Sequence, residues 1–284
     1  MSKMEQHVAA RHAARDEAVA LRARIRSSFF ADQTAGAAPL CVQGNLVILP
    51  SYLADDFHRY CEANPKPCPL LAISKAGDPT LPSLAEDFDL RTDVPLYRIY
   101  RRGELERETT DIRDVWEDDF VGFVLGCSYS FEAALLDHGI PLRHIERNMG
   151  VPMFISNIET VPAGTFAGPT VVSMRSMTPE HAQQAANICL QFDRAHGEPV
   201  QIGNAAAIGI NDVMAPDFGE PVPVEDGEIP VFWACGVTPQ MAIKKARPDI
   251  CITHAPGFMV ITDIAASELA AGRGPEISSA PQSN

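Results

Sequence analysis

The sequence predicts an α/β protein in which a three-layer domain with a mainly parallel sheet contains an inserted, smaller two-layer α+β domain. Residues 121–127 and 231–235 are short and almost wholly apolar, as in strands buried on both faces. A predicted helix follows each segment, an order typical of parallel sheets. The predicted units are a main domain of residues 1–147 and 225–271, an inserted domain of residues 148–224, and a mobile tail of residues 272–284.

In the first half of the chain, apolar patterns predict the helices and strands, and Pro and Gly residues predict where they end. Residues 5–30 contain neither Pro nor Gly and carry a partial apolar stripe, which predicts a helix. Pro65 and Pro67 end a second predicted helix. The other predicted elements here are strands at 46–49, 70–74, 96–101 and 121–127, a helix at 52–63, and a helix that Gly139 closes.

The second half begins with the proposed insertion and then returns to the main sheet. The insertion has predicted strands at 152–158, 170–174 and 199–202 and a helix at 178–192. Because residues 231–235 restore the buried-strand pattern, we place them in the main sheet. A helix at 238–246 and strands at 250–253 and 258–262 complete the prediction.

Composition limits the classes of function. The chain has 284 residues, 46% of them hydrophobic, and a formal charge of −14, which disfavours nucleic acids and anionic membranes as partners. No apolar run approaches the roughly 20 residues that a membrane-spanning helix needs, and no secretory signal pattern opens the sequence. Seven cysteines without CxxC pairs favour reduced thiols. We therefore expect a cytoplasmic protein.

One local design occurs twice. An apolar strand ends at a cysteine, a hydroxyl residue follows three positions later, and an acid or amide two positions after that. The two sets are Cys127, Ser130 and Glu132, and Cys235, Thr238 and Gln240. Both hydroxyl residues are good helix N-caps, although such caps are common in any α/β protein. If both strands lie in one parallel sheet, both helix N-termini meet at its carboxyl edge and could hold the two carboxylates of one ligand.

Three longer segments carry a resemblance to a known family. They are GCSYSFEAALLDHGIPLRHIE at 126–146, IPVFWACGVTPQ at 229–240 and ITHAPGFMVITD at 252–263. Together with VQGNLVILP at 42–50 and GPTVVSMR at 168–175, these segments resemble the D-glutamate cyclase family, whose members are also described as hydro-lyases. The resemblance implies a two-domain α/β architecture and the conversion of D-glutamate to 5-oxo-D-proline with loss of water.

The implied ligand is a small amino dicarboxylate, and no cofactor is predicted. The histidines lack metal-ligand spacing, so no metal site is predicted, while a weakly held divalent cation and a homo-oligomeric assembly stay open. Dehydration of another small carboxylate is the nearest alternative activity. Phe258 stands where the family motif has histidine, which favours a second alternative, a non-catalytic sensor of amino acids or dicarboxylates.

The chemistry needs a carboxylate anchor, a base for the amine, donors that polarise the second carboxyl, and an acid. The catalytic candidates are Glu132, His254 and Cys127. The candidates for substrate binding are Ser128, Ser130, Arg143, Arg175, Cys235, Gly236, Thr238 and Gln240. Each catalytic candidate has a plainer interpretation: Glu132 complements a helix dipole, His254 is a core histidine, and Cys127 is a small buried hydrophobe.

Overall fold

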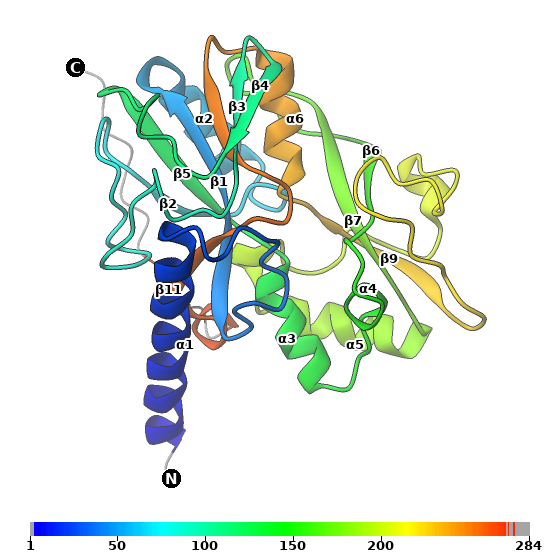
Figure 1. The fold of residues 1–284 in the computed structure, drawn as a ribbon. Helices are drawn as coiled ribbons and strands as arrows, with labels where there is room; N and C mark the ends of the chain where they lie inside the picture. The colour runs from blue at the N-terminus through cyan, green and yellow to red at the C-terminus, as the bar shows by residue number, and fades with distance from the viewer. Residues whose placement is uncertain (1–2, 271, 273–274, 276–284) are drawn as a thin grey trace.

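The computed structural model describes residues 3–270 together with Gly272 and Pro275, and its strands form two sheets (Figure 1). The predicted tail therefore lies almost wholly outside the described residues. The seven-stranded sheet contains β1 (Cys41–Pro50), β2 (Leu70–Ile73), β3 (Tyr97–Arg101), β4 (Glu104–Thr109), β5 (Phe120–Gly126), β10 (Cys251–His254) and β11 (Val260–Ala265). The four-stranded sheet contains β6 (Met153–Glu159), β7 (Pro169–Met177), β8 (Gln201–Ile202) and β9 (Ile229–Ala234).

The prediction of a mainly parallel sheet was wrong. Every strand pair among the described residues is antiparallel, in the order β2-β5-β1-β10-β3-β4, with β11 also on β1, and in the order β6-β7-β9-β8. The mixed α/β character holds. A strand that is apolar throughout indicates burial on both faces, and antiparallel strands satisfy that condition when both faces are covered.

Strand β5 is buried on both faces because two hydrophobic cores lie on opposite sides of its sheet. Phe120 and Val124 belong to one core, which also contains Trp233 of the second sheet. Phe123 and Leu125 belong to the other core. Since successive side chains of a strand point to opposite faces, this alternation produces the run of apolar residues seen in the sequence.

The second sheet gathers the strands of the proposed insertion and one strand more. As predicted, β6, β7 and β8 do not join the sheet that contains β5. The assignment of residues 231–235 to the main sheet was wrong, because β9 pairs with β7 and β8. A buried strand pattern reports that a strand is covered and does not report which sheet it joins. The boundaries of the two domains stay a prediction.

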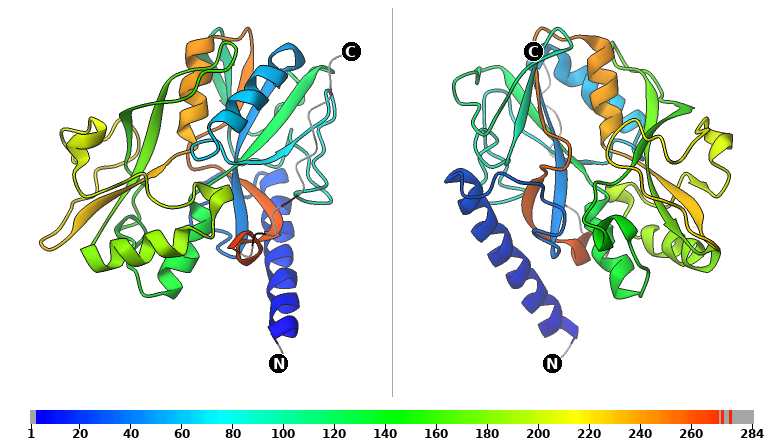
Figure 2. Two further views of the ribbon diagram at one scale, coloured as in Figure 1. Left: turned by 180° about the vertical axis from the view of Figure 1, so that it is seen from behind. Right: turned by 45° about the vertical axis from the view of Figure 1, so that its right-hand side comes forward.

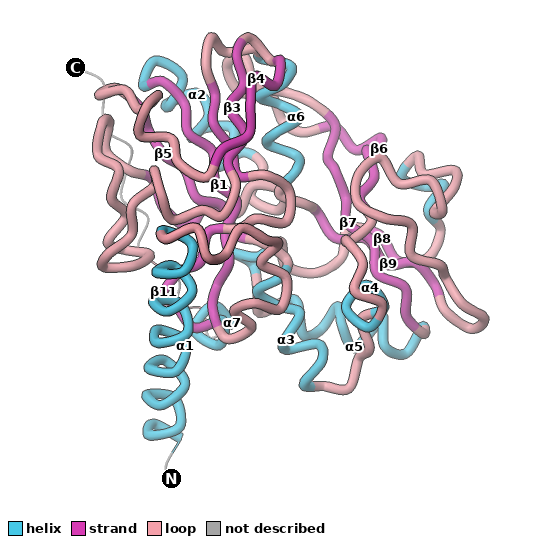
Figure 3. The backbone as a smooth tube through the Cα atoms, viewed as in Figure 1, coloured by secondary structure: helices cyan, strands magenta, loops and turns pink. Residues whose placement is uncertain are grey.

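Helices fill the space between and beneath the sheets (Figures 2 and 3). They are α2 (Ala54–Ala63), α3 (Tyr129–Asp137), α4 (Arg143–Glu146), α5 (Pro179–Cys189), α6 (Val237–Ala246) and α7 (Ala266–Ala270), with short 3-10 turns at Ser51–Leu53, Asp193–Ala195 and Ala205–Ile208. Helix α6 follows a strand of the small sheet, yet its Ala242 and Ile243 pack in a core of the large one. Helix α3 follows a strand of the large sheet and reaches β7 of the small one through Glu132. This exchange of helices ties the two sheets together.

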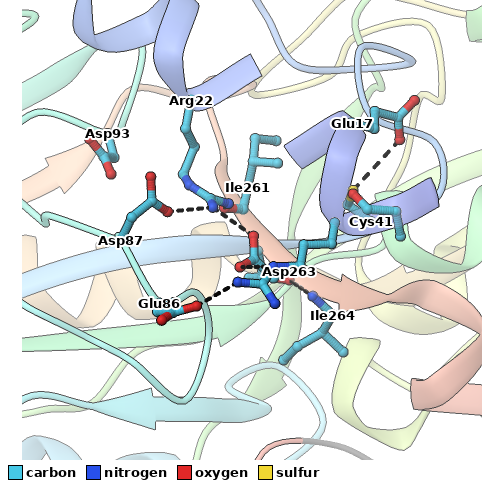
Figure 4. A network of polar contacts seen from close by, with 12 residues as sticks. Glu17, Arg22, Cys41, Glu86, Asp87, Asp93, Ile261, Asp263 and Ile264 are labelled. Atoms are coloured by element: carbon cyan, nitrogen blue, oxygen red, sulfur yellow. Dashed lines mark hydrogen bonds and ion pairs between the residues drawn. The ribbon is translucent and has the colours of Figure 1, made fainter. Parts of the chain in front are cut away.

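Helix α1 (Lys3–Arg26) projects from the body and is anchored by its second half (Figure 1). Ala14, Ala18, Leu21 and Ile25 share an apolar cluster with β11. Arg22 is fully buried and donates to Asp87, to Asp263 and to the carbonyl oxygen of Ile261, at 2.7, 2.6 and 3.1 Å (Figure 4). Apolar packing and a charge-assisted network therefore attach the second half of the helix to the rest of the protein.

Candidate functional site

The two segments of shared design fold in the same way. In the first, the N–H of Gln43 in β1 donates to the Ser130 hydroxyl at 3.1 Å. In the second, the N–H of Val171 in β7 donates to the Thr238 hydroxyl at 2.9 Å. Each hydroxyl therefore fastens the first turn of its helix to the strand beside the one that precedes the helix.

This geometry corrects the predicted capping roles. The N-cap residues are Ser128 for α3 and Gly236 for α6, and neither makes a side-chain capping bond. Ser130 and Thr238 lie inside the first turn, where their buried hydroxyls bond to a neighbouring strand. Hydroxyl residues near helix starts favour capping statistically, and here tertiary contact takes the hydroxyl instead.

Both helix starts line one cavity of about 340 Å³ between the two sheets. Ser128 and Tyr129 come from α3, and Gly236 and Val237 from α6. Helix α6 begins close to β1: a Cβ added at Gly236 would lie 2.2 Å from the side chain of Asn45, so only glycine fits at this position. The structure thus brings the two helix N-termini to one cavity, although they belong to two sheets rather than to one parallel sheet.

Arg98 is the only residue lining this cavity, within the described part of the chain, that carries a full charge at neutral pH. It lies on β3, and its Nε donates to Glu108 at 2.8 Å. Among the described residues, no aspartate or glutamate lines the cavity. The arginine and the partial positive charges of two helix N-termini make the cavity favourable for an anion, in a protein with a formal charge of −14.

His254 lines the cavity as a buried, neutral histidine. Burial is the main cause that lowers its pKa to about 4, and the charge of Arg98 lowers it further. Its Nδ1 lies 3.1 Å from the amide nitrogen of Leu46 and 3.3 Å from the carbonyl oxygen of that residue. Because the amide N–H can only donate, the closer contact assigns a bare Nδ1 and a proton on Nε2.

His196 is a second buried histidine of the same cavity, and the sequence prediction missed it. Burial lowers its pKa to about 4. Its Nδ1 lies 2.8 Å from the carbonyl oxygen of Lys66. Since a carbonyl oxygen only accepts, the proton is on Nδ1 and Nε2 is bare. The cavity therefore holds two neutral histidines of opposite tautomer.

Arg175 and Glu132 form a buried ion pair behind the cavity wall. Their closest atoms, Nη2 and Oε1, are 2.5 Å apart, and His144 Nε2 lies 3.1 Å from the same oxygen. Burial raises the pKa of Glu132, but the charge of Arg175 and the contact with His144 outweigh it and lower the pKa to about 2. Glu132 is thus ionised at neutral pH and does not line the cavity.

The same arginine holds two serines of the cavity wall. Its Nη2 donates to Ser128 Oγ and its Nη1 to Ser173 Oγ, both at 3.0 Å. A serine oxygen that accepts from arginine keeps its own O–H free to donate elsewhere. Arg175 therefore does not reach a ligand directly and positions two hydroxyl donors at the cavity.

Cys127 and Cys235 both line the cavity as thiols. Burial is the main cause that raises the pKa of Cys127 to about 12 and that of Cys235 to about 11. A thiol is a poor nucleophile until it ionises, so this environment supports the packing interpretation of Cys127.

Comparison with known proteins shows the family of this chain. Residues 121–263 match the family described as D-glutamate cyclase. A protein of Verminephrobacter eiseniae (strain EF01-2) is 56% identical over 243 residues, which cover 86% of this chain and 89% of that protein. A protein of Bordetella petrii is 53% identical over 253 residues, covering 88% and 96%. Both carry the name "putative hydro-lyase". The chain belongs to the D-glutamate cyclase family.

Among solved structures, a nitrogen repressor-like protein from Methanococcus jannaschii covers 85% of this D-glutamate cyclase family chain and 96% of its own length. The TM-score is 0.37 and the identity 12%. This likeness is too low to carry a conclusion about fold or activity.

The remaining predicted residues of this family member lie away from the cavity. Arg143 forms a partly buried pair with Glu228 at 2.5 Å. Gln240 lines a neighbouring cavity of about 510 Å³ that shares Arg98 and Val237 with the first. Phe258 lies in the turn beside the cavity, where Pro256, Gly257 and Met259 line it and Phe258 does not.

Arg98, His196, Asn45 and Ser173 are among the polar cavity residues that sequence reasoning missed. Ser173 is the one with a local signal, because it stands two positions before the candidate Arg175 on a strand and so faces the same side. The other three are isolated polar residues, and only the fold brings them together. In the described ranges, no group of three or more His, Cys, Asp or Glu side chains could hold a metal ion, and no helix could cross a membrane.

Proposed function

We propose that this D-glutamate cyclase family member is a lyase that removes water from a small amino dicarboxylate, with D-glutamate, which closes to 5-oxo-D-proline, as the leading substrate. One observation carries the proposal: the cavity has Arg98 as its only fully charged lining residue among those described, and two helix starts besides. Three separate positive features suit a ligand with two carboxylates.

The neutral donors of the cavity support the same chemistry. The hydroxyls of Ser128 and Ser173, oriented by Arg175, and the Nε2–H of His254 can stabilise negative charge that develops on an attacked carboxyl group. A related small carboxylate would meet the same donors, so the identity of the substrate rests on turnover measurements.

The alternative of a non-catalytic sensor rests on Phe258, which replaces a histidine of the family motif. Phe258 does not line the cavity, although its neighbours Gly257 and Met259 do. Turnover separates the two functions, since a sensor gains stability with its ligand and leaves the ligand unchanged.

The test incubates the purified protein with D-glutamate, L-glutamate and glutarate and follows the loss of one water by mass spectrometry. We expect 5-oxoproline from D-glutamate at a higher rate than from L-glutamate. Arg98→Gln should weaken binding of glutarate, and the neighbouring Arg101→Gln, on the exposed end of β3, serves as the matched control. Equal rates for the two enantiomers, or no product above buffer, would refute the proposed substrate.

A further inference from the structure

His196 is held in a backbone conformation that its side chain does not favour. Its φ is 80° and its ψ −8°, in the left-handed region, where a bulky residue is uncommon. Two bonds fix the turn: the N–H of Gly197 donates to the carbonyl of Phe192 at 2.8 Å, and Nδ1 of His196 donates to the carbonyl of Lys66 at 2.8 Å. The structure around this turn therefore determines the position of the imidazole.

The bond to Lys66 also determines what the ring offers to the cavity. With the proton on Nδ1, Nε2 has a free lone pair, because the bond to Lys66 is the only side-chain hydrogen bond that His196 makes among the described residues. At neutral pH the ring stays uncharged, because burial lowers its pKa. The Nε2 of His254, in contrast, carries a proton. The bare Nδ1 of His254 already accepts from the N–H of Leu46, so Nε2 of His196 is the imidazole nitrogen that is left to accept a proton from a ligand.

We propose that His196 is the proton-accepting catalytic residue of this cavity, which receives the amino group of the ligand at Nε2, while His254 donates a hydrogen bond to the attacked carboxyl. This inference rests on the proposed function and adds the recognition of the amine to it. It also explains why a ligand with two carboxylates would need an amino group to be selected.

The proton balance of the cyclisation agrees with a single acceptor. The N–C bond of the lactam forms, one C–O bond of the carboxylate breaks, and the two protons that leave the ammonium depart with the released oxygen as water. His196 takes each proton from nitrogen in turn at Nε2 and passes it directly to the leaving oxygen, because burial disfavours a lasting imidazolium. His254 stays neutral throughout, because it supplies a hydrogen bond and gives up no proton.

Nitrogen-15 NMR of histidine-labelled protein tests the assignment without any need for turnover. We expect a protonated Nδ1 for His196 and a protonated Nε2 for His254 in the free protein. Adding D-glutamate, with spectra recorded before conversion, should shift the Nε2 signal of His196, and glutarate, which lacks the amine, should not. The opposite tautomer for His196, or an equal shift with both ligands, would overturn the proposal.

His196→Asn separates catalysis from structure. Asparagine tolerates the left-handed conformation, and its amide nitrogen can replace Nδ1 in the bond to Lys66, but it has no counterpart of Nε2. We expect a loss in kcat of about 100-fold or more, with glutarate affinity kept. The exposed His138→Asn is the control. An unchanged kcat refutes the role of His196 and leaves the proposed function intact. A wild-type protein that makes no 5-oxoproline refutes the proposed function, while the NMR result still decides whether His196 receives the amine.

Discussion

The buried pair of Arg175 and Glu132 shows how one residue can serve a site without lining it. The guanidinium lies 5.4 and 5.5 Å from the ring centroids of Phe131 and Trp233, and it donates to two serines of the cavity wall. A guanidinium in this setting needs a nearby carboxylate, because an unpaired buried charge is strongly unfavourable. Glu132 supplies that carboxylate, so its function is to keep Arg175 in place.

Glu132→Gln should therefore destabilise the protein strongly. Removing the negative charge leaves the buried Arg175 unpaired, which should lower the free energy of unfolding by about 3 to 5 kcal/mol. Glu146→Gln, on an exposed side chain nearby, should change it by less than about 1 kcal/mol. Urea denaturation of the two variants measures the difference, and equal values would show that the pair is dispensable.

The two cavity histidines predict a pH dependence of stability. Their pKa values fall from 6.5 to about 4 on folding, so the unfolded state binds more protons between these values. Stability is fully present above pH 6.5 and declines as the pH falls toward 4, by about 1.4 kcal/mol per pH unit for each histidine. Denaturation at several pH values should give a smaller slope for His196→Asn than for wild type. An unchanged slope would contradict the neutral state of this ring.

At the scale of elements, the hydroxyls of Ser130 and Thr238 link helices to strands. Alanine at either position removes the partner of a buried backbone N–H, which should lower the free energy of unfolding by about 1 to 3 kcal/mol. Thr165→Ala, at an exposed position, is the control. Thermal denaturation compares the three variants. If only one of the two alanine variants loses stability, the two hydroxyls have the same geometry but do not contribute equally to stability.

Arg22 is the fully buried arginine of helix α1 within the described residues, and its contacts help to anchor the helix. Arg22→Met removes one partner each of Asp87 and Asp263, and the loss of these charge-assisted hydrogen bonds should lower the free energy of unfolding by about 1.5 to 3 kcal/mol. The control Arg15→Met, on the same helix, removes an exposed pair with Glu86 and a longer contact with Asp263, and it should change the free energy of unfolding by less than about 1 kcal/mol. Denaturation and limited proteolysis near α1 measure both effects. A proteolysis rate in Arg22→Met equal to that of wild type would contradict the anchoring role.

Most elements could be predicted from the sequence, because apolar periodicity and breakers act locally. The helix ending at Gly139 and the strand at β5 are examples. The direction of the strands and the sheet that each strand joins could not be predicted, because β5 and β9 look alike in the sequence and join different sheets. Strand β4 was missed because its side chains are mostly exposed and carry little apolar signal.

The candidate site could be predicted in part, for a comparable reason. Cys127, Ser128, Cys235 and Gly236 stand at strand-to-helix turns, which a sequence pattern can locate, and all four line the cavity. Arg98 and His196 come from a strand and a turn with no motif of their own. Only the tertiary structure brings such residues to one place, so a pattern in a single sequence cannot find them.

At the scale of the whole molecule, the cavity is built by both sheets, and a ligand bound there should stabilise the folded chain. At a concentration of 100 times its Kd, a dicarboxylate should add about 2.7 kcal/mol to the free energy of unfolding. Thermal denaturation with glutarate should therefore show a higher Tm than with butyrate, which has one carboxylate. Arg98→Gln should reduce the shift. The same shift with either acid would indicate a site for one carboxylate only.

The matched units have a consequence for how a ligand chooses its direction. Helices α3 and α6 each begin two positions after a cysteine, and each ends near a left-handed residue twelve positions after that cysteine, Gly139 or Arg247. A molecule with two carboxylates would thus meet similar backbone at each of the two helix starts that line the cavity. Backbone of this kind cannot distinguish the head of such a molecule from its tail. That choice falls to side chains that have no counterpart at the other helix, Arg98 and His196 among them, so the direction of binding should change when these residues are replaced.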